Sequence, residues 1–184
     1  MSEYQYHEFC RISSPMPKEV RTKMNSLSSR AMLTSHGASY VYNYSDFGYD
    51  PIDIIKDHFD VYFYIANWGT INLTFKFNKL DINIQELKKY QLEDVINFIE
   101  FDDSIILEIT LGSEEGFGWT DGEGILVEML PIYDELKNNN YQFLDFSKAI
   151  NNSFIDGENE LLQELLTSNK LSNAEQFIFD IFNR

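Results

Sequence analysis

Apolar side chains in this chain change from a spacing of two residues to a helical spacing at a glycine-rich stretch, residues 112–124. Before it, segments such as INLTFKF (71–77) alternate apolar and polar side chains, which is typical of a β-strand. After it, ILVEMLPIYDELKNNN (125–140) places its apolar side chains along one helical face. This order predicts an α+β fold, a mostly antiparallel sheet with packed helices, followed by an acidic helical subdomain.

The first half is predicted to consist of strands joined by short helices and turns. Asp50 and Pro51 are typical of an N-cap and a first helical residue, which predicts a helix over residues 50–59. Asp102 and Asp103 separate two strand-like runs and predict a β-hairpin. The other elements expected here are strands at 4–12, 38–44, 61–68 and 71–77, and helices at 14–27 and 83–90.

Two details of the central strands are predicted from side-chain pattern. Residues 71–77 should form a half-exposed strand, with Asn72, Thr74 and Lys76 facing outward. The preceding ANWGT segment (66–70) should form a turn in which Trp68 plugs the end of the sheet.

The second half is predicted to be helical, with Pro131 kinking or dividing the first helix. Further helices are expected at 141–154, 158–169 and 173–184. The predicted organisation is a β-rich half (1–111), a junction (112–124) and a helical subdomain (125–184), with one continuous domain as the alternative.

The net charge of −16 is concentrated near the C-terminus. Residues 1–50 carry five basic and five acidic side chains, whereas residues 101–184 carry four basic and seventeen acidic ones. An acidic surface repels phosphate backbones and anionic lipids, so neither nucleic-acid nor membrane binding is expected. A basic protein partner is predicted instead, with solubility alone as the simpler explanation of the charge.

A cytoplasmic location is predicted from three features of the chain. The first residues lack a signal-like apolar segment, and no run approaches the roughly 20 apolar residues that span a bilayer. The single cysteine, Cys10, excludes an intramolecular disulfide and is interpreted as a core residue rather than a reactive thiol.

The stretch EEGFGWTDGEG (114–124) is the strongest candidate site. Its glycines lack the spacing of phosphate-binding loops, and its acids lack the spacing of a calcium loop. A docking loop or a hinge is therefore predicted, and Trp119 is expected either to pack on the core or to anchor a partner. The predicted partner-binding residues are Glu114, Glu115, Trp119, Asp121 and Glu123.

A second candidate lies on the helix predicted at 50–59. Asp53 and Asp57 are four residues apart, and His58 follows, so the three side chains present ligands suited to a metal or to acid–base chemistry. A solvated helix face explains the same pattern. No catalytic residue and no cofactor is predicted.

Several segments resemble a family of uncharacterised bacterial proteins that share the pattern YHEF, LSSRA and FDVYFYIANWGT. These segments stand at residues 6–9, 27–31 and 59–70, and the resemblance covers roughly residues 4–150. It implies no activity, cofactor or catalytic residue. The chain departs from the pattern after Thr70, where Ile71 and Asn72 stand in place of arginine, which puts an anion-binding role in doubt.

Two functions of different classes follow from these features. The first is a non-enzymatic interaction protein, of inhibitor, immunity or complex-subunit type, whose acidic C-terminal half docks a basic protein. The alternative is a small metal-dependent hydrolase that uses clustered carboxylates, either the acids of the 114–124 stretch or the Asp53, Asp57 and His58 group. A structural scaffold is a further possibility beside the first.

Overall fold

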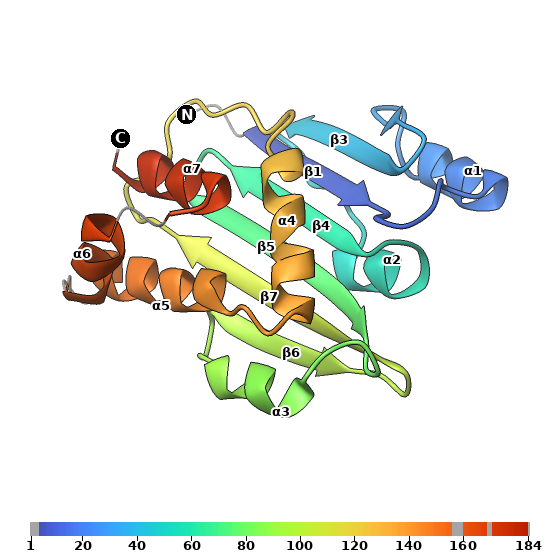
Figure 1. Ribbon diagram of the computed structural model, residues 1–184. Coiled ribbons are helices and arrows are strands. Elements are labelled where there is room, and N and C mark those ends of the chain that lie inside the picture. The colour runs from blue at the N-terminus through green and yellow to red at the C-terminus, as the bar shows by residue number, and fades with distance from the viewer. Residues whose placement is uncertain (1–3, 156–159, 169–170, 184) are drawn as a thin grey trace.

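The computed structural model describes residues 4–155, 160–168 and 171–183. Over these residues, seven strands form one sheet in the order β2-β3-β1-β4-β5-β7-β6, with every neighbouring pair antiparallel (Figure 1). The strands are β1 Tyr4–Cys10, β2 Met32–Leu33, β3 Gly37–Asn43, β4 Val61–Ala66, β5 Thr70–Asn78, β6 Ile96–Glu100 and β7 Ser104–Gly112. The predicted α+β fold with an antiparallel sheet is confirmed.

Seven helices accompany the sheet in the described part of the chain. They are α1 Lys18–Leu27, α2 Pro51–His58, α3 Ile84–Leu87 with a 3-10 turn Lys88–Tyr90, α4 Leu126–Lys137, α5 Gln142–Ile155, α6 Glu160–Thr167 and α7 Asn173–Phe182. Asp50 caps α2 as predicted, because its Oδ1 accepts the Ile52 N–H at 2.8 Å. No described helix is long and apolar enough to cross a bilayer.

One face of the sheet lies against helices from the second half of the chain. In Figure 1, α4 crosses in front of the central strands, with α5 and α7 beside it. Phe63 of β4, Phe75 of β5 and Leu107 of β7 are buried in one cluster with Met129 of α4 and Phe146 of α5. Strands and C-terminal helices therefore share a core. The division into three segments stays a prediction.

The opposite face is covered over part of its width by α1 and α2. Phe9 of β1 and Tyr40 of β3 are fully buried there, together with Met24 of α1 and Ile55 of α2. Burial of these large apolar side chains supplies the main driving force for docking the two helices. Beside this cover, Asn72 of β5 and Glu108 and Thr110 of β7 line a cleft on the same face.

The prediction that Asn72 and Thr74 face solvent is wrong. Asn72 is 9% exposed and Thr74 is fully buried. The Asn72 side-chain amide donates to Glu108 and to Thr110 on β7, and its carbonyl oxygen accepts the Thr74 hydroxyl. These polar groups are buried because β5 lies inside the sheet, where β7 provides hydrogen-bond partners for Asn72 and Asn72 provides one for Thr74.

Pro131 does not divide the helix in which it lies. α4 runs unbroken from Leu126 to Lys137 with Pro131 inside it. Proline removes one N–H donor from the helix, but Met129, Ile132 and Leu136 on either side are buried in the core. The energy of this packing outweighs the helix-breaking tendency of proline at this position.

Candidate functional site

The predicted docking residues lie on the loop of residues 113–125, which joins β7 to α4 at one end of the sheet (Figure 1). Phe117 anchors the first part of this loop. Its side chain is 3% exposed and its ring centroid lies 5.0 Å from that of Phe182 in α7. Its N–H donates to the Asn67 carbonyl, in the β4–β5 turn, at 3.2 Å. This part of the loop is packed into the protein.

Tyr4 of β1 anchors the second part of the loop. Its hydroxyl donates to Asp121 Oδ1 at 3.0 Å and accepts the N–H of Gly122 at 3.0 Å. Burial raises the pKa of Tyr4 to about 12, with Asp121 adding to the shift, so the hydroxyl keeps its proton. The same Asp121 oxygen accepts the Glu123 N–H, which fixes the turn that follows Trp119.

Replacing Tyr4 by phenylalanine is expected to loosen this part of the loop while keeping the aromatic ring. The buried Gly122 N–H loses its partner, and we expect a loss of roughly 1–2 kcal/mol in the free energy of unfolding. Urea unfolding measures this loss, and hydrogen exchange should show faster exchange of the amides at residues 121–124. Unchanged exchange there would show that the hydroxyl does not hold the loop.

All five predicted partner-binding residues are exposed on this anchored loop. Trp119 is 68% exposed, and its ring centroid lies 5.3 Å from that of Tyr4. One edge of the indole thus leans on the core while most of its surface faces solvent. The expected packing of Trp119 on the core is limited to this contact with Tyr4, and its role as an anchor for a partner stays a prediction.

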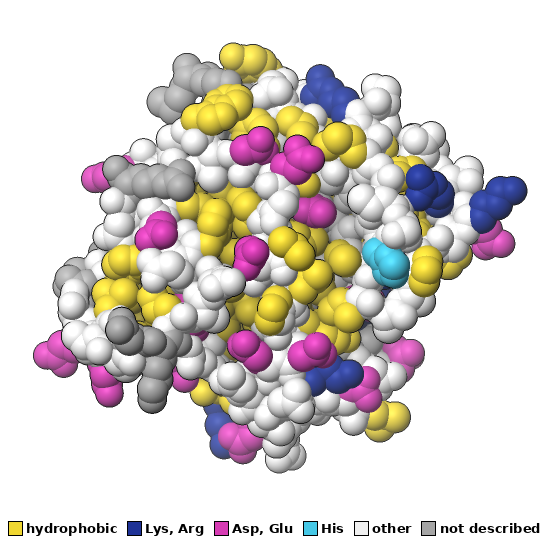
Figure 2. Space-filling model, turned by 45° about the horizontal axis from the view of Figure 1, so that its top comes forward, with side chains coloured by type: hydrophobic (Ala, Val, Ile, Leu, Met, Phe, Trp, Pro, Cys, Tyr) yellow, Lys and Arg dark blue, Asp and Glu magenta, His cyan; other side chains and the backbone are white. Residues whose placement is uncertain are grey.

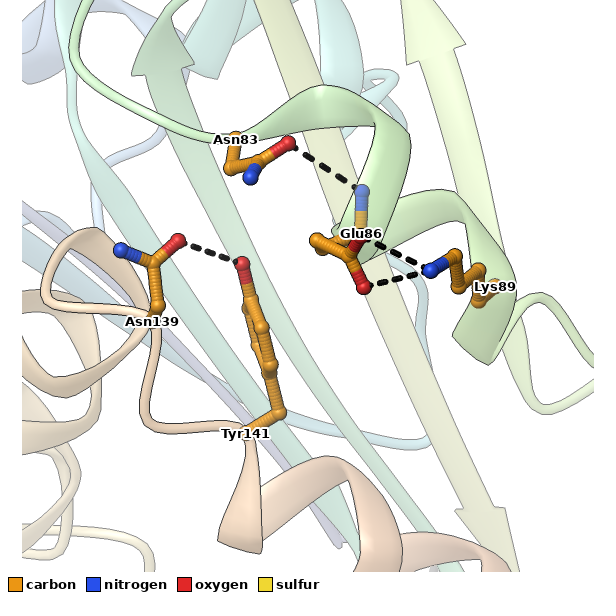
Figure 3. Close-up of polar contacts among 5 residues, drawn as sticks. All are labelled: Asn83, Glu86, Lys89, Asn139 and Tyr141. Carbon is orange, nitrogen blue, oxygen red and sulfur yellow. Dashed lines mark hydrogen bonds and ion pairs between the residues drawn. The ribbon is translucent and has the colours of Figure 1, made fainter.

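The acids of the loop form no ion pair with any described residue. Ion pairs among the described residues join Lys79 and Lys88 to Glu100, Lys89 to Glu86, and Lys137 to Asp81. These lie near α3 and the end of α4, at the opposite end of the molecule from the loop (Figure 1). Lys89 Nζ lies 2.7 Å from Glu86 Oε2. Figure 3 draws this pair together with Asn83 and the Asn139–Tyr141 hydrogen bond. The loop charges are left unneutralised.

A cleft of about 650 Å³ adjoins the loop at this end of the sheet. Glu114 and Glu115 line it on one side, and Trp68 and Phe182 also line it. Trp68 is 41% exposed, so the prediction that it plugs the sheet end is wrong. Phe117, from a segment distant in sequence, takes the buried place near this turn instead. Trp68 is therefore a site residue that sequence pattern missed.

The view in Figure 2 shows how charge is arranged on one face of the molecule. Acidic side chains surround a central area of hydrophobic side chains, and Lys and Arg lie mostly towards the edge. An apolar area with an acidic rim is complementary to a surface that combines apolar and basic side chains.

Asp53, Asp57 and His58 do not form a metal centre. The described residues contain no group of three or more histidine, cysteine or acidic side chains placed to hold a metal ion. His58 Nε2 instead lies 2.8 Å from Lys23 Nζ of α1. Burial and the neighbouring Lys23 lower the pKa of His58, which favours a neutral ring. The hydrolase alternative gains no support from these side chains.

A second cleft, of about 330 Å³, lies on the sheet face that α1 and α2 leave partly open. It is lined by His7 of β1, Tyr64 of β4 and Glu108 of β7, and by Asp46 and Phe47 from the β3–α2 loop. The sequence pattern predicted that His7 lies in a strand, but it did not predict which residues surround His7 in the cleft. Only strand pairing brings them together, since His7 stands opposite Tyr64 in the β1–β4 register.

No protein-family model, curated protein or solved structure matches the chain. The resemblance carried by residues 4–150 therefore stays a prediction.

Proposed function

We propose that this chain is a non-enzymatic interaction protein that uses the loop of residues 113–125 to dock a basic protein partner. One observation carries the proposal: Trp119 is 68% exposed on a loop that Phe117 and Tyr4 anchor to the core. An aromatic side chain already held in place loses little conformational entropy on binding, which makes it a good interface anchor.

The charges of the loop add specificity to this anchor. Glu114, Glu115 and Glu123 are exposed and form no ion pair with the described residues. Such charges mainly raise the association rate with a positively charged surface, and salt screens them. The partner that fits has an apolar pocket for an indole, bordered by Lys or Arg side chains.

The proposal includes a cytoplasmic setting and gives Cys10 no chemical role. Burial raises the pKa of the Cys10 thiol to about 11, which keeps it protonated and weakly reactive. The mode of docking is compatible with an inhibitor, an immunity-type protein or a complex subunit.

The first experiment captures the partner with tagged protein from the cells that express it, at 50 and 300 mM salt, and then measures its affinity in purified form. Trp119→Ala is expected to weaken binding at least about 30-fold at both salt concentrations, because it removes the anchor. The triple variant Glu114→Gln, Glu115→Gln, Glu123→Gln should slow association and remove most of the salt dependence. Asp121 stays unchanged because it holds the loop to Tyr4.

The matched control neutralises three exposed acids elsewhere: Asp53→Asn, Glu93→Gln and Glu164→Gln. It removes the same net charge but should retain most of the association rate and salt dependence. If the two triple variants change the association rate and its salt dependence equally, the loop acids act only through the net charge of the protein and not through their position. Full affinity of Trp119→Ala would overturn the proposal.

A further inference from the structure

The cleft of about 330 Å³ on the partly open sheet face has the character of a small-molecule site that is independent of the docking loop. Its volume lies at the lower end of the range for ligand pockets, roughly 300–1,000 Å³. Its floor is formed by side chains of β1, β4, β5 and β7, and the loop before α2 forms one wall. Ligand contacts placed on a sheet are held rigidly.

His7 is the unusual group in this cleft. Its side chain is 5% exposed, and its Nδ1 lies 2.9 Å from the Tyr62 hydroxyl. The rings of Phe47 and Tyr64 lie 5.0 and 4.7 Å from the imidazole, centroid to centroid. Its Nε2 is buried and has no hydrogen-bond partner among the described residues. A buried polar atom without a partner is costly, which sets His7 apart from the other residues that line the cleft.

His7 carries no charge in this cleft. Burial lowers the pKa of His7 to about 4, so the ring is neutral at pH 7. In one neutral tautomer Nδ1–H donates to the Tyr62 oxygen, and in the other the Tyr62 hydroxyl donates to Nδ1 and Nε2 carries the proton. In either tautomer the uncharged ring does not repel a cation beside it.

The charge of the lining selects for cations. Asp46 and Glu108 line the cleft, and no Lys or Arg is among the described lining residues. Neither carboxylate forms an ion pair with a described residue. Gln5 Nε2 donates to Asp46 Oδ1 at 3.1 Å and Asn72 Nδ2 donates to Glu108 Oε1 at 2.9 Å, so neutral amides hold both acids in place. Phosphate or carboxylate ligands are disfavoured here.

The aromatic side chains of the lining also favour a cation. Phe47, Tyr49, Tyr62 and Tyr64 all line the cleft. The negative faces of such rings attract ammonium and guanidinium groups, and this attraction strengthens when the cation is desolvated. We propose that this cleft binds a small organic cation, a primary amine or a guanidine, which pairs with Asp46 or Glu108 beside His7.

The test uses putrescine and agmatine as probes, with 1,4-butanediol and succinate as uncharged and anionic controls at constant ionic strength. Two-dimensional NMR of the imidazole nitrogens reads the site directly, and the partly exposed His36 and His58 serve as internal references. At least one amine should give a saturable shift of the His7 nitrogens with a dissociation constant below about 1 mM. The two controls should leave the His7 signals unchanged.

The carboxylate variants Asp46→Asn and Glu108→Gln should weaken amine binding, at least one of them by about tenfold. Asp53→Asn, an exposed acid on α2 outside the cleft, is the matched control and should bind as the unchanged protein does. Unfolding curves check that the variants are folded. The two acids are replaced in separate variants, so that if one variant misfolds the other still tests the proposal. Absence of a His7 shift with both amines, an equal shift with butanediol, or full affinity in both carboxylate variants overturns the proposal.

Discussion

Replacing Gly69 by alanine is expected to lower the free energy of unfolding by roughly 3–5 kcal/mol, with urea unfolding as the measurement. Gly69 has a φ of +105°, which side-chain-bearing residues rarely adopt. A Cβ at this position would lie 2.1 Å from the Ser113 carbonyl oxygen, which is backbone and cannot rotate away. The Ser113 N–H also donates to Gly69 O at 2.8 Å. The substitution should therefore displace the β4–β5 turn and the loop of residues 113–125 together.

Gly118→Ala, in the neighbouring loop of residues 113–125, is the matched control. Gly118 has a φ of +63°, but a Cβ there meets nothing within 4 Å. The substitution should cost only the conformational strain, about 1–2 kcal/mol. If the two variants lose the same stability, the close contact between the turn and the loop is not important for the fold.

His7 is expected to make stability depend on pH between pH 6.5 and pH 4. Burial lowers its pKa in the folded state from 6.5 to about 4, so the unfolded chain binds the proton more readily in this range. The stability that neutral His7 contributes is fully present above pH 6.5 and is lost as pH falls towards 4. A pKa shift of this size corresponds to a loss of roughly 3 kcal/mol in the free energy of unfolding over this pH range.

The measurement compares the unchanged protein with His7→Gln by urea unfolding at pH 7, 5.5 and 4. The variant lacks this titration, so its stability relative to the unchanged protein should improve by roughly 3 kcal/mol between pH 7 and pH 4. Titration of other groups largely cancels in the difference. An NMR titration midpoint for His7 above pH 6 would contradict the expected shift, as would a difference that stays constant with pH.

Local sequence signals predicted most of the secondary structure correctly. Asp50 and Pro51 determine the start of α2 through a cap and a preset φ, which need no tertiary contact. Asp102 and Asp103 mark the β6–β7 hairpin because its strands pair with their immediate neighbours in the chain. The exposure of Glu114 and Glu115 also followed from local composition.

Predictions failed where the partners of a residue come from distant segments. Asn72 was expected in solvent because it alternates with the apolar side chains of Ile71 and Leu73. This alternation indicates the face of the strand on which Asn72 lies, but not what covers that face. It is buried because β7, more than thirty residues later, supplies Glu108 and Thr110 as its partners. Pro131 was expected to kink or divide its helix; it does not divide it, because core packing keeps α4 unbroken, and the kink stays a prediction.

The sequence by itself thus determined the α+β class, most helix and strand positions, and the exposure of the acidic side chains in the 113–125 loop. These properties depend on periodicity, capping and charge, which neighbouring residues carry. Tertiary structure alone decided that Trp119 rests on Tyr4, that Trp68 lines a cleft, and that His7 lies between Phe47 and Tyr64. These contacts depend on strand order and register, because side chains far apart in sequence meet only after the strands have paired.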